Sequence, residues 1–235
     1  IISEIYEILD KEYRNEYFYK NTLLNKLLIG VHSPKTTIAL TEVPVYKSKA
    51  DFILINGKAV VYEIKTELDN LERLESQLQD YYKAFTTVYV VTSESNFEAV
   101  KRKLDTSNVG IYVLTKKNSI SLRKKAIDDY SYLNLETIFR ILRKKEYENI
   151  LLKNYGYLPE VSQFYYYSEC KKMFKNLDID IAYQMFISEL KKRNKIEIQY
   201  FYQVPKELKS LAYFSGLKKK DYCILQEFLL KKYGG

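Results

Sequence analysis

Apolar positions along the chain recur with two different periods. Over residues 3–29 they fall at helical spacing with charged residues between them, and residues 69–85 repeat that pattern. We therefore expect one long helix over 3–29, which Gly30 ends, and another over 69–85, which Asp69 or Asn70 caps.

Between these helices the pattern changes to short β-branched runs. Residues 38–46, 51–55 and 59–66 read as strands, and Asn56-Gly57 between the last two is a strong β-hairpin signal. A helix over 94–104 and strands over 88–91, 109–114 and 119–122 follow. Up to residue 114 the order of elements is α-β-β-β-α-β-α-β, which predicts an α/β fold with a mixed central sheet.

From about residue 130 the pattern turns helical. Helices are expected over 135–152, 162–174, 179–192 and 218–233, with Asp178 or Asp180 capping the third, and residues 196–202 read as a strand or wing. We predict two domains, an α/β domain over residues 1–125 and an all-helical basic domain over 126–235.

Composition excludes several classes of protein. Of 235 residues, 46% are hydrophobic and 29% are charged, as in globular chains. No apolar run approaches the roughly 18–20 residues of a transmembrane helix, and the first residues lack a secretory signal pattern, so we expect a cytoplasmic protein without a membrane partner. Two cysteines are too few for a disulfide scaffold. His32, the single histidine, reads as a loop residue rather than a zinc ligand.

The net charge of +8 lies entirely in the second half of the chain. Residues 1–120 hold 16 basic and 16 acidic residues, whereas residues 121–235 hold 22 basic and 14 acidic ones. The basic second half is suited to binding a polyanion such as nucleic acid. The aromatic run Phe164-Tyr165-Tyr166-Tyr167 could stack on its bases. The compositional bias of an AT-rich genome, with the aromatic residues in a helical core, is the alternative explanation.

The second strand of the hairpin carries an unusual pair of charges. Glu63 and Lys65 stand two residues apart and share a face of an otherwise apolar strand. Ionised groups in a half-buried strand are unfavourable unless they are paired or bind an ion. A two-residue turn at Asn56-Gly57 would place Asp51 on the opposite face. An odd-length loop, such as Ile55-Asn56-Gly57 with Gly57 in the left-handed region, would bring Asp51 to the face of Glu63 and Lys65, and we expect this loop.

Two carboxylates and a lysine on one face predict a site for a hard cation. Oxygen atoms of Asp51 and Glu63, with the carbonyl of Ile64, suit Mg²⁺, and Mn²⁺ is expected to substitute. Such an ion polarises a phosphate and lowers the pKa of a bound water, while Lys65 assists the attacking water.

The spacing of Asp51, Glu63, Ile64 and Lys65 resembles the PD-(D/E)XK motif of the restriction-endonuclease-like nuclease superfamily. The expected order of elements resembles that core over about residues 3–115, although Ala50 stands where the motif has proline. Gln77 and Tyr81, four residues apart on the following helix, resemble the Gln-x-x-x-Tyr element of the RecB-like branch, and Glu16 falls where many members carry an extra metal-binding or supporting carboxylate.

The resemblance implies a Mg²⁺-dependent nuclease that hydrolyses phosphodiester bonds, in DNA rather than RNA. Asp51, Glu63, Lys65, Gln77, Tyr81 and Glu16 are its expected site residues, and the basic helical half would bind nucleic acid or a protein partner. One alternative is a non-catalytic nucleic-acid- or protein-binding module on a nuclease fold, for example in phage–host conflict. Another is that Glu63 and Lys65 form an ordinary ion pair on a solvent-facing sheet.

Overall fold

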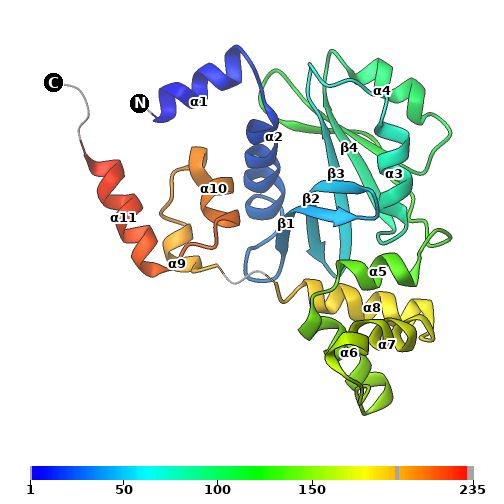
Figure 1. The fold of residues 1–235 in the computed structure, drawn as a ribbon. Helices are drawn as coiled ribbons and strands as arrows, with labels where there is room; N and C mark the ends of the chain where they lie inside the picture. The colour runs from blue at the N-terminus through cyan, green and yellow to red at the C-terminus, as the bar shows by residue number, and fades with distance from the viewer. Residues whose placement is uncertain (1, 194–195, 232–235) are drawn as a thin grey trace.

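The centre of the molecule is one six-stranded mixed sheet. The computed structural model describes residues 2–193 and 196–231 (Figure 1). The strands are β1 (Ile38–Val45), β2 (Ser48–Asn56), β3 (Lys58–Lys65), β4 (Thr87–Ser93), β5 (Gly110–Leu114) and β6 (Ile120–Lys124), in the spatial order β1-β2-β3-β4-β5-β6. β1 to β3 are antiparallel, β3 to β5 are parallel, and β6 is antiparallel to β5. The predicted α/β fold with a mixed sheet and following helices is confirmed.

The β2–β3 hairpin decides which side chains share a face. The pairing continues to either side of Gly57, which alone joins the strands with a φ of 77°. The predicted odd-length connection is therefore confirmed, although Ile55 and Asn56 lie in β2. Continuing the register places Asp51 across from Glu63.

The predicted single helix over 3–29 is wrong. The segment forms α1 (Ile2–Lys11), α2 (Glu16–Leu23) and the π-helix η1 (Leu24–Ile29). The side chain of Asn15 accepts a hydrogen bond from the Phe18 amide and so begins α2. Arg14 donates to the carbonyl groups of Thr115 and Lys116, which holds the break against the sheet.

Two helices follow the hairpin and the next strand. They are α3 (Leu74–Tyr82) and α4 (Phe97–Leu104). α3 begins later than predicted because Asp69 accepts hydrogen bonds from both the amide and the hydroxyl of Thr66, each at 2.7 Å, which closes a turn there. Neither Asp69 nor Asn70 caps α3, because its N-cap residue is Arg73.

The remaining described chain is helical. Its elements are α5 (Leu135–Ile141), α6 (Lys144–Tyr155), α7 (Gln163–Lys175), α8 (Ile179–Leu190), α9 (Ile198–Phe201), η2 (Lys206–Leu208), α10 (Lys209–Phe214) and α11 (Lys219–Leu230). The predicted helix over 135–152 is two helices, and the strand considered at 196–202 is wrong because α9 lies there. Asp178 caps α8 as predicted, whereas residues 232 and 233 of the last predicted helix lie outside the described residues. Within the described ranges, no helix is long and apolar enough to cross a bilayer.

Helices cover both faces of the sheet (Figure 1). On one face, apolar strand residues such as Val61 and Val90 share a buried cluster with α3, α4 and α5 to α8. On the other face, residues such as Phe52 and Ile64 share a second cluster with α2, η1 and α9 to α11. The sheet is thus the middle layer of three, and its strand ends remain available to polar side chains.

Candidate active site

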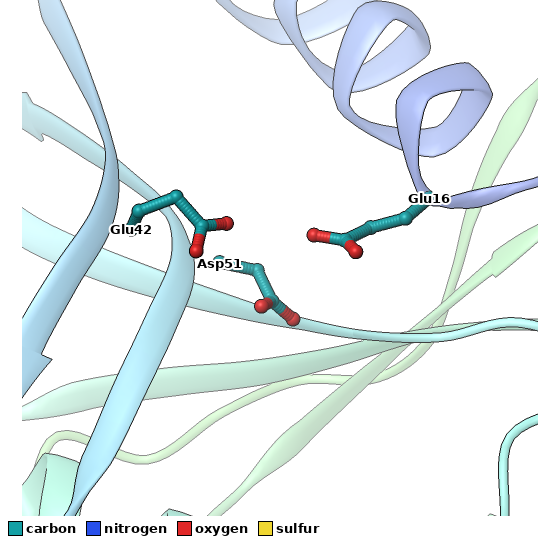
Figure 2. Close-up of side chains that lie close together, drawn as sticks. All are labelled: Glu16, Glu42 and Asp51. Carbon is teal, nitrogen blue, oxygen red and sulfur yellow. The ribbon is translucent and has the colours of Figure 1, made fainter.

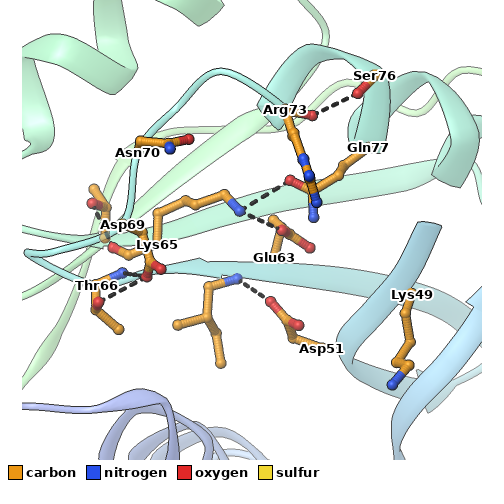
Figure 3. Close-up of polar contacts among 12 residues, drawn as sticks. Lys49, Asp51, Glu63, Lys65, Thr66, Asp69, Asn70, Arg73, Ser76 and Gln77 are labelled. Atoms are coloured by element: carbon orange, nitrogen blue, oxygen red, sulfur yellow. Dashed lines mark hydrogen bonds and ion pairs between the residues drawn. The ribbon is translucent and has the colours of Figure 1, made fainter.

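Glu63 and Lys65 lie at the carboxyl end of β3 and are both buried. Glu63 is 1% exposed and Lys65 is 9% exposed. The Lys65 ammonium donates to Glu63 Oε1 at 2.8 Å (Figure 3). The alternative of an ordinary ion pair on a solvent-facing sheet is therefore wrong. Buried charges of this kind need a full set of partners.

Helix α3 supplies those partners. Gln77 Oε1 accepts a second hydrogen bond from Lys65 Nζ at 3.0 Å. The Tyr81 hydroxyl lies 2.6 Å from Glu63 Oε2, to which it donates, and 2.8 Å from the carbonyl oxygen of Lys49. Burial and the Glu63 charge raise the pKa of Tyr81, so the hydroxyl stays protonated. Because Gln77 and Tyr81 are one helical turn apart, α3 fixes both ends of the Glu63–Lys65 pair.

Asp51 lies where β2 and β3 begin to separate. Its Oδ2 atom accepts a hydrogen bond from the Ile64 amide at 2.8 Å (Figure 3). Burial, and then the nearby charge of Glu63, raise the pKa of Asp51 to about 8, although the Ile64 amide and Lys20 oppose the shift. A carboxyl group held this way binds a proton or a cation more readily than an exposed one.

Two further carboxylates approach Asp51 from neighbouring elements. Figure 2 shows Glu16 from the first turn of α2 and Glu42 from β1 directed toward Asp51. One carboxylate oxygen from each of the three lies within 4.8 Å of the others. Three oxygen ligands at this spacing match the chemistry of a Mg²⁺ or Ca²⁺ site.

Basic side chains balance this acidic group. Lys20 lies 2.6 Å from Glu16 and also contacts Glu42, and Lys49 lies 3.0 Å from Glu42. Burial lowers the pKa of Lys20, but hydrogen bonds to Glu16 and Glu42 outweigh it and leave that pKa above its ordinary value. Burial raises the pKa of Glu42, but hydrogen bonds from Lys20 and Lys49 outweigh this effect and hold the pKa below its ordinary value.

Glu42 has a left-handed backbone with a φ of 54°. A residue with a Cβ atom seldom adopts this conformation, which is strained. The β1–β2 register pairs Thr41 with Phe52 and Val43 with Ala50, so Glu42 falls between paired residues and opposite Asp51. The strained residue therefore sits at the point where β1 adds a carboxylate to the group.

Comparison with known proteins identifies the family of this chain. The family model described as bacteriophage P4 protein cII matches residues 10–213. The chain belongs to the bacteriophage P4 protein cII family. It is similar to a protein named Protein cII of Enterobacteria phage P4, with 32% identity over 130 residues, which cover 54% of this chain and 48% of that relative. The chain thus spans about half the length of the curated relative. No solved structure matches it.

The structure of this cII-family chain brings most of the predicted site residues together. Glu63, Lys65, Gln77 and Tyr81 form one hydrogen-bonded group, and Asp51 contacts the Ile64 amide between Glu63 and Lys65. Glu63 is not one of the three carboxylates that meet within 4.8 Å, and both of its oxygens accept hydrogen bonds from protein groups. The group observed between Asp51 and Ile64 is the amide, whereas the sequence predicts the Ile64 carbonyl as a ligand.

Sequence reasoning missed Glu42. The available signal is a charged residue inside the apolar strand 38–46, close to Pro44, which marks an irregular edge strand. β1 is indeed an edge strand that pairs only with β2 among the described strands.

Other candidates from the sequence lie elsewhere. His32 is exposed in the loop after η1, where its ring lies 3.3 Å from the side chain of Asn56. In the aromatic run of α7, Phe164 is 84% exposed and forms an edge-on pair with Tyr165. A cavity of about 600 Å³, lined by residues such as Leu78 and Tyr82, lies against α3 and contains none of the site residues named above.

Proposed function

We propose that this cII-family chain is a Mg²⁺-dependent nuclease that hydrolyses phosphodiester bonds, in DNA rather than RNA. The observation that carries the proposal is the buried Glu63–Lys65 pair beside Asp51. The placement of these residues on β2 and β3, with Gln77 and Tyr81 on α3, also agrees with the resemblance to PD-(D/E)XK nucleases. The name of the curated relative, Protein cII, states no activity, so the proposal rests on the geometry of the site.

The donor set fits a hard divalent cation. The Asp51 Oδ1 atom makes no hydrogen bond within the described part of the chain, while Oδ2 is held by the Ile64 amide. Asp51 would thus offer one oriented oxygen, with Glu16 and Glu42 beside it. A divalent cation held there would polarise a phosphate and lower the pKa of a coordinated water.

Lys65 would act on the attacking water. Its ammonium has three donors, of which Glu63 and Gln77 accept two. The third remains for a water or a phosphate oxygen, so the lysine would orient the nucleophile or stabilise charge on the phosphate. Glu63 would hold the ammonium in place, and Tyr81 would hold Glu63.

One observation favours a second function. Both oxygens of Glu63 are engaged inside the protein, so Glu63 would have to release a partner before it could bind a metal ion. If it does not, the same surface would bind nucleic acid or a protein without hydrolysis. This second candidate is a binding module on the same fold.

A cleavage assay separates the two functions. The protein is incubated with linear DNA, circular DNA and RNA, each with Mg²⁺, Mn²⁺ or EDTA. The nuclease produces cut DNA with either metal ion and none with EDTA. Retarded but uncut nucleic acid under every condition contradicts the nuclease and supports the binding module.

A further inference from the structure

A third polar side chain, at the N-cap position that precedes α3, continues the stripe that faces the site. Tyr81 and Gln77 are separated by one turn, and Arg73 stands one further turn toward the start of the helix. Residues four apart lie on the same helix face. Figure 3 shows the Arg73 side chain directed toward the region of Gln77 and Glu63. The stripe therefore runs outward from buried Tyr81 to exposed Arg73.

The chain fixes the backbone of Arg73 firmly. The Thr66–Asp69 turn reverses the chain directly after Lys65, and Asn96 donates to the Thr66 carbonyl at 2.8 Å. The Arg73 carbonyl then accepts from the Gln77 amide at 3.0 Å and from the Ser76 hydroxyl at 2.8 Å. The start of α3 is thus held beside the end of β3.

The Arg73 guanidinium has no ion-pair partner among the described residues, whereas the lysines around it are paired. Lys65 is paired with Glu63, while Lys20 and Lys49 are paired with carboxylates of the acidic group. The Arg73 guanidinium makes no hydrogen bond or ion pair with any residue in 2–193 or 196–231. Its five donors therefore remain available to a ligand.

We propose that Arg73 binds a backbone phosphate of the nucleic-acid strand, adjacent to the phosphate that lies at the site. The inference rests on the proposed function, since that function supplies the polyanionic substrate. The lysines beside the carboxylates of the site are already paired with them, so a cation without a partner among the described residues is the group that is free to bind a phosphate of the strand. A guanidinium binds a phosphate through two parallel hydrogen bonds, which fixes both position and orientation.

The test measures binding apart from cleavage. A short fluorescein-labelled DNA is titrated with the protein in Ca²⁺, and fluorescence anisotropy gives the Kd at several salt concentrations. We expect Arg73→Gln to raise the Kd about tenfold and to lower the slope of log Kd against log salt by about 0.7–0.9, the value for one phosphate contact. Arg73→Lys should restore the slope and part of the affinity, because it keeps the charge but loses the paired hydrogen bonds.

Lys35→Gln is the matched control. It removes one positive charge from exposed Lys35, which precedes β1 near the hairpin end of β2 and so lies away from Asp51, and it should change neither Kd nor slope. Parent-like affinity and slope in Arg73→Gln overturn the inference, as does an equal loss in Lys35→Gln. Absence of DNA binding by the parent also overturns it.

Cleavage with Mg²⁺ distinguishes this inference from the proposed function. If the parent cuts DNA, Arg73→Gln should raise KM about tenfold with a smaller effect on kcat. If Arg73→Gln cuts DNA with an unchanged KM, the role of Arg73 is overturned, and the proposed nuclease function still stands. If the parent binds without cutting and Arg73→Gln still loses affinity, Arg73 keeps its role and the nuclease fails.

Discussion

Glu63 shows how this site keeps a buried charge. Its two oxygens accept from Lys65 and Tyr81, and Gln77 holds Lys65 in turn. Removal of one partner from a buried ionised group destabilises a protein more than loss of an exposed pair. Each side chain of the group is therefore expected to affect stability as well as activity.

Tyr81→Phe removes only the hydroxyl that donates to Glu63. The variant should lower the free energy of unfolding by about 1.5–3 kcal/mol, the range for a hydrogen bond to a charged group. Urea denaturation followed by far-UV circular dichroism measures the change. Tyr157→Phe is the control, since Tyr157 is 61% exposed and its hydroxyl should contribute little. Equal stability of the parent and Tyr81→Phe would contradict the contact.

Asp51→Asn should change how stability depends on pH. In the metal-free folded protein, burial and then the Glu63 charge raise the pKa of Asp51 from 3.8 to about 8. Between these two pH values the folded state therefore binds more protons than the unfolded state. The Asp51 contribution to stability therefore falls as pH rises from about 4 to about 8. The asparagine side chain of the variant does not titrate and can still accept from the Ile64 amide. The melting temperature of Asp51→Asn minus that of the parent, measured in EDTA, should rise steadily as the pH rises over this range. A difference in melting temperature that does not change with pH would rule out the pKa shift of Asp51.

At the scale of elements, the hairpin decides which carboxylates meet. Gly57 alone joins β2 and β3, and its left-handed φ of 77° sets the register that places Asp51 across from Glu63. The space around a Cβ atom at Gly57 is open, so substitution there tests the backbone conformation without a steric clash.

Gly57→Ala should destabilise the protein by about 1–2 kcal/mol, since a residue with a Cβ atom disfavours the left-handed region. Gly57→Asn should lose less, because asparagine tolerates this conformation. Urea denaturation in EDTA compares the two variants with the parent. A smaller loss for alanine than for asparagine would contradict the turn geometry.

Local signals explain which elements could be predicted from the sequence. Asn56-Gly57 is a turn signal contained in two residues, so the hairpin followed from it, and the shared face of Glu63 and Lys65 followed from their spacing of two along a strand. The break in the predicted helix over 3–29 depends instead on Arg14, whose partners Thr115 and Lys116 lie about a hundred positions away.

The same distinction applies to the candidate site. The spacing of Gln77 and Tyr81 is local, and the structure joins them to Lys65 and Glu63. The approach of Glu42 to Asp51 depends on the β1–β2 register and on a left-handed φ at Glu42, neither of which a single sequence specifies.

At the scale of the whole molecule, the helical half packs against the sheet. α5 to α8 share one buried cluster with the sheet, and α9 to α11 share the other. The rings of Phe85, which follows α3, and Phe186 of α8 lie 5.7 Å apart, and both are fully buried. The boundary predicted near residue 125 therefore crosses a contact between buried side chains.

Phe186→Ala should lower the free energy of unfolding by about 3–5 kcal/mol, as expected for an aromatic ring removed from a core. The parent and the variant should each unfold in a single transition in urea, because many other buried residues also join the helices to the sheet. Phe164→Ala is the control, with an expected change within about 0.5 kcal/mol at an 84% exposed position. Two separate transitions, with only one of them shifted, would instead support independent domains.

The most direct test of the account is the single-turnover rate of DNA cleavage. The rate is measured in Mg²⁺ for the parent, Asp51→Asn and Lys65→Ala, after circular dichroism has verified that each variant is folded. We expect the parent to cut only in the presence of the metal ion, and each variant to lose about a hundredfold or more in rate. A Lys65→Ala variant that cuts as fast as the parent, or cleavage that persists in EDTA, would contradict the proposed site.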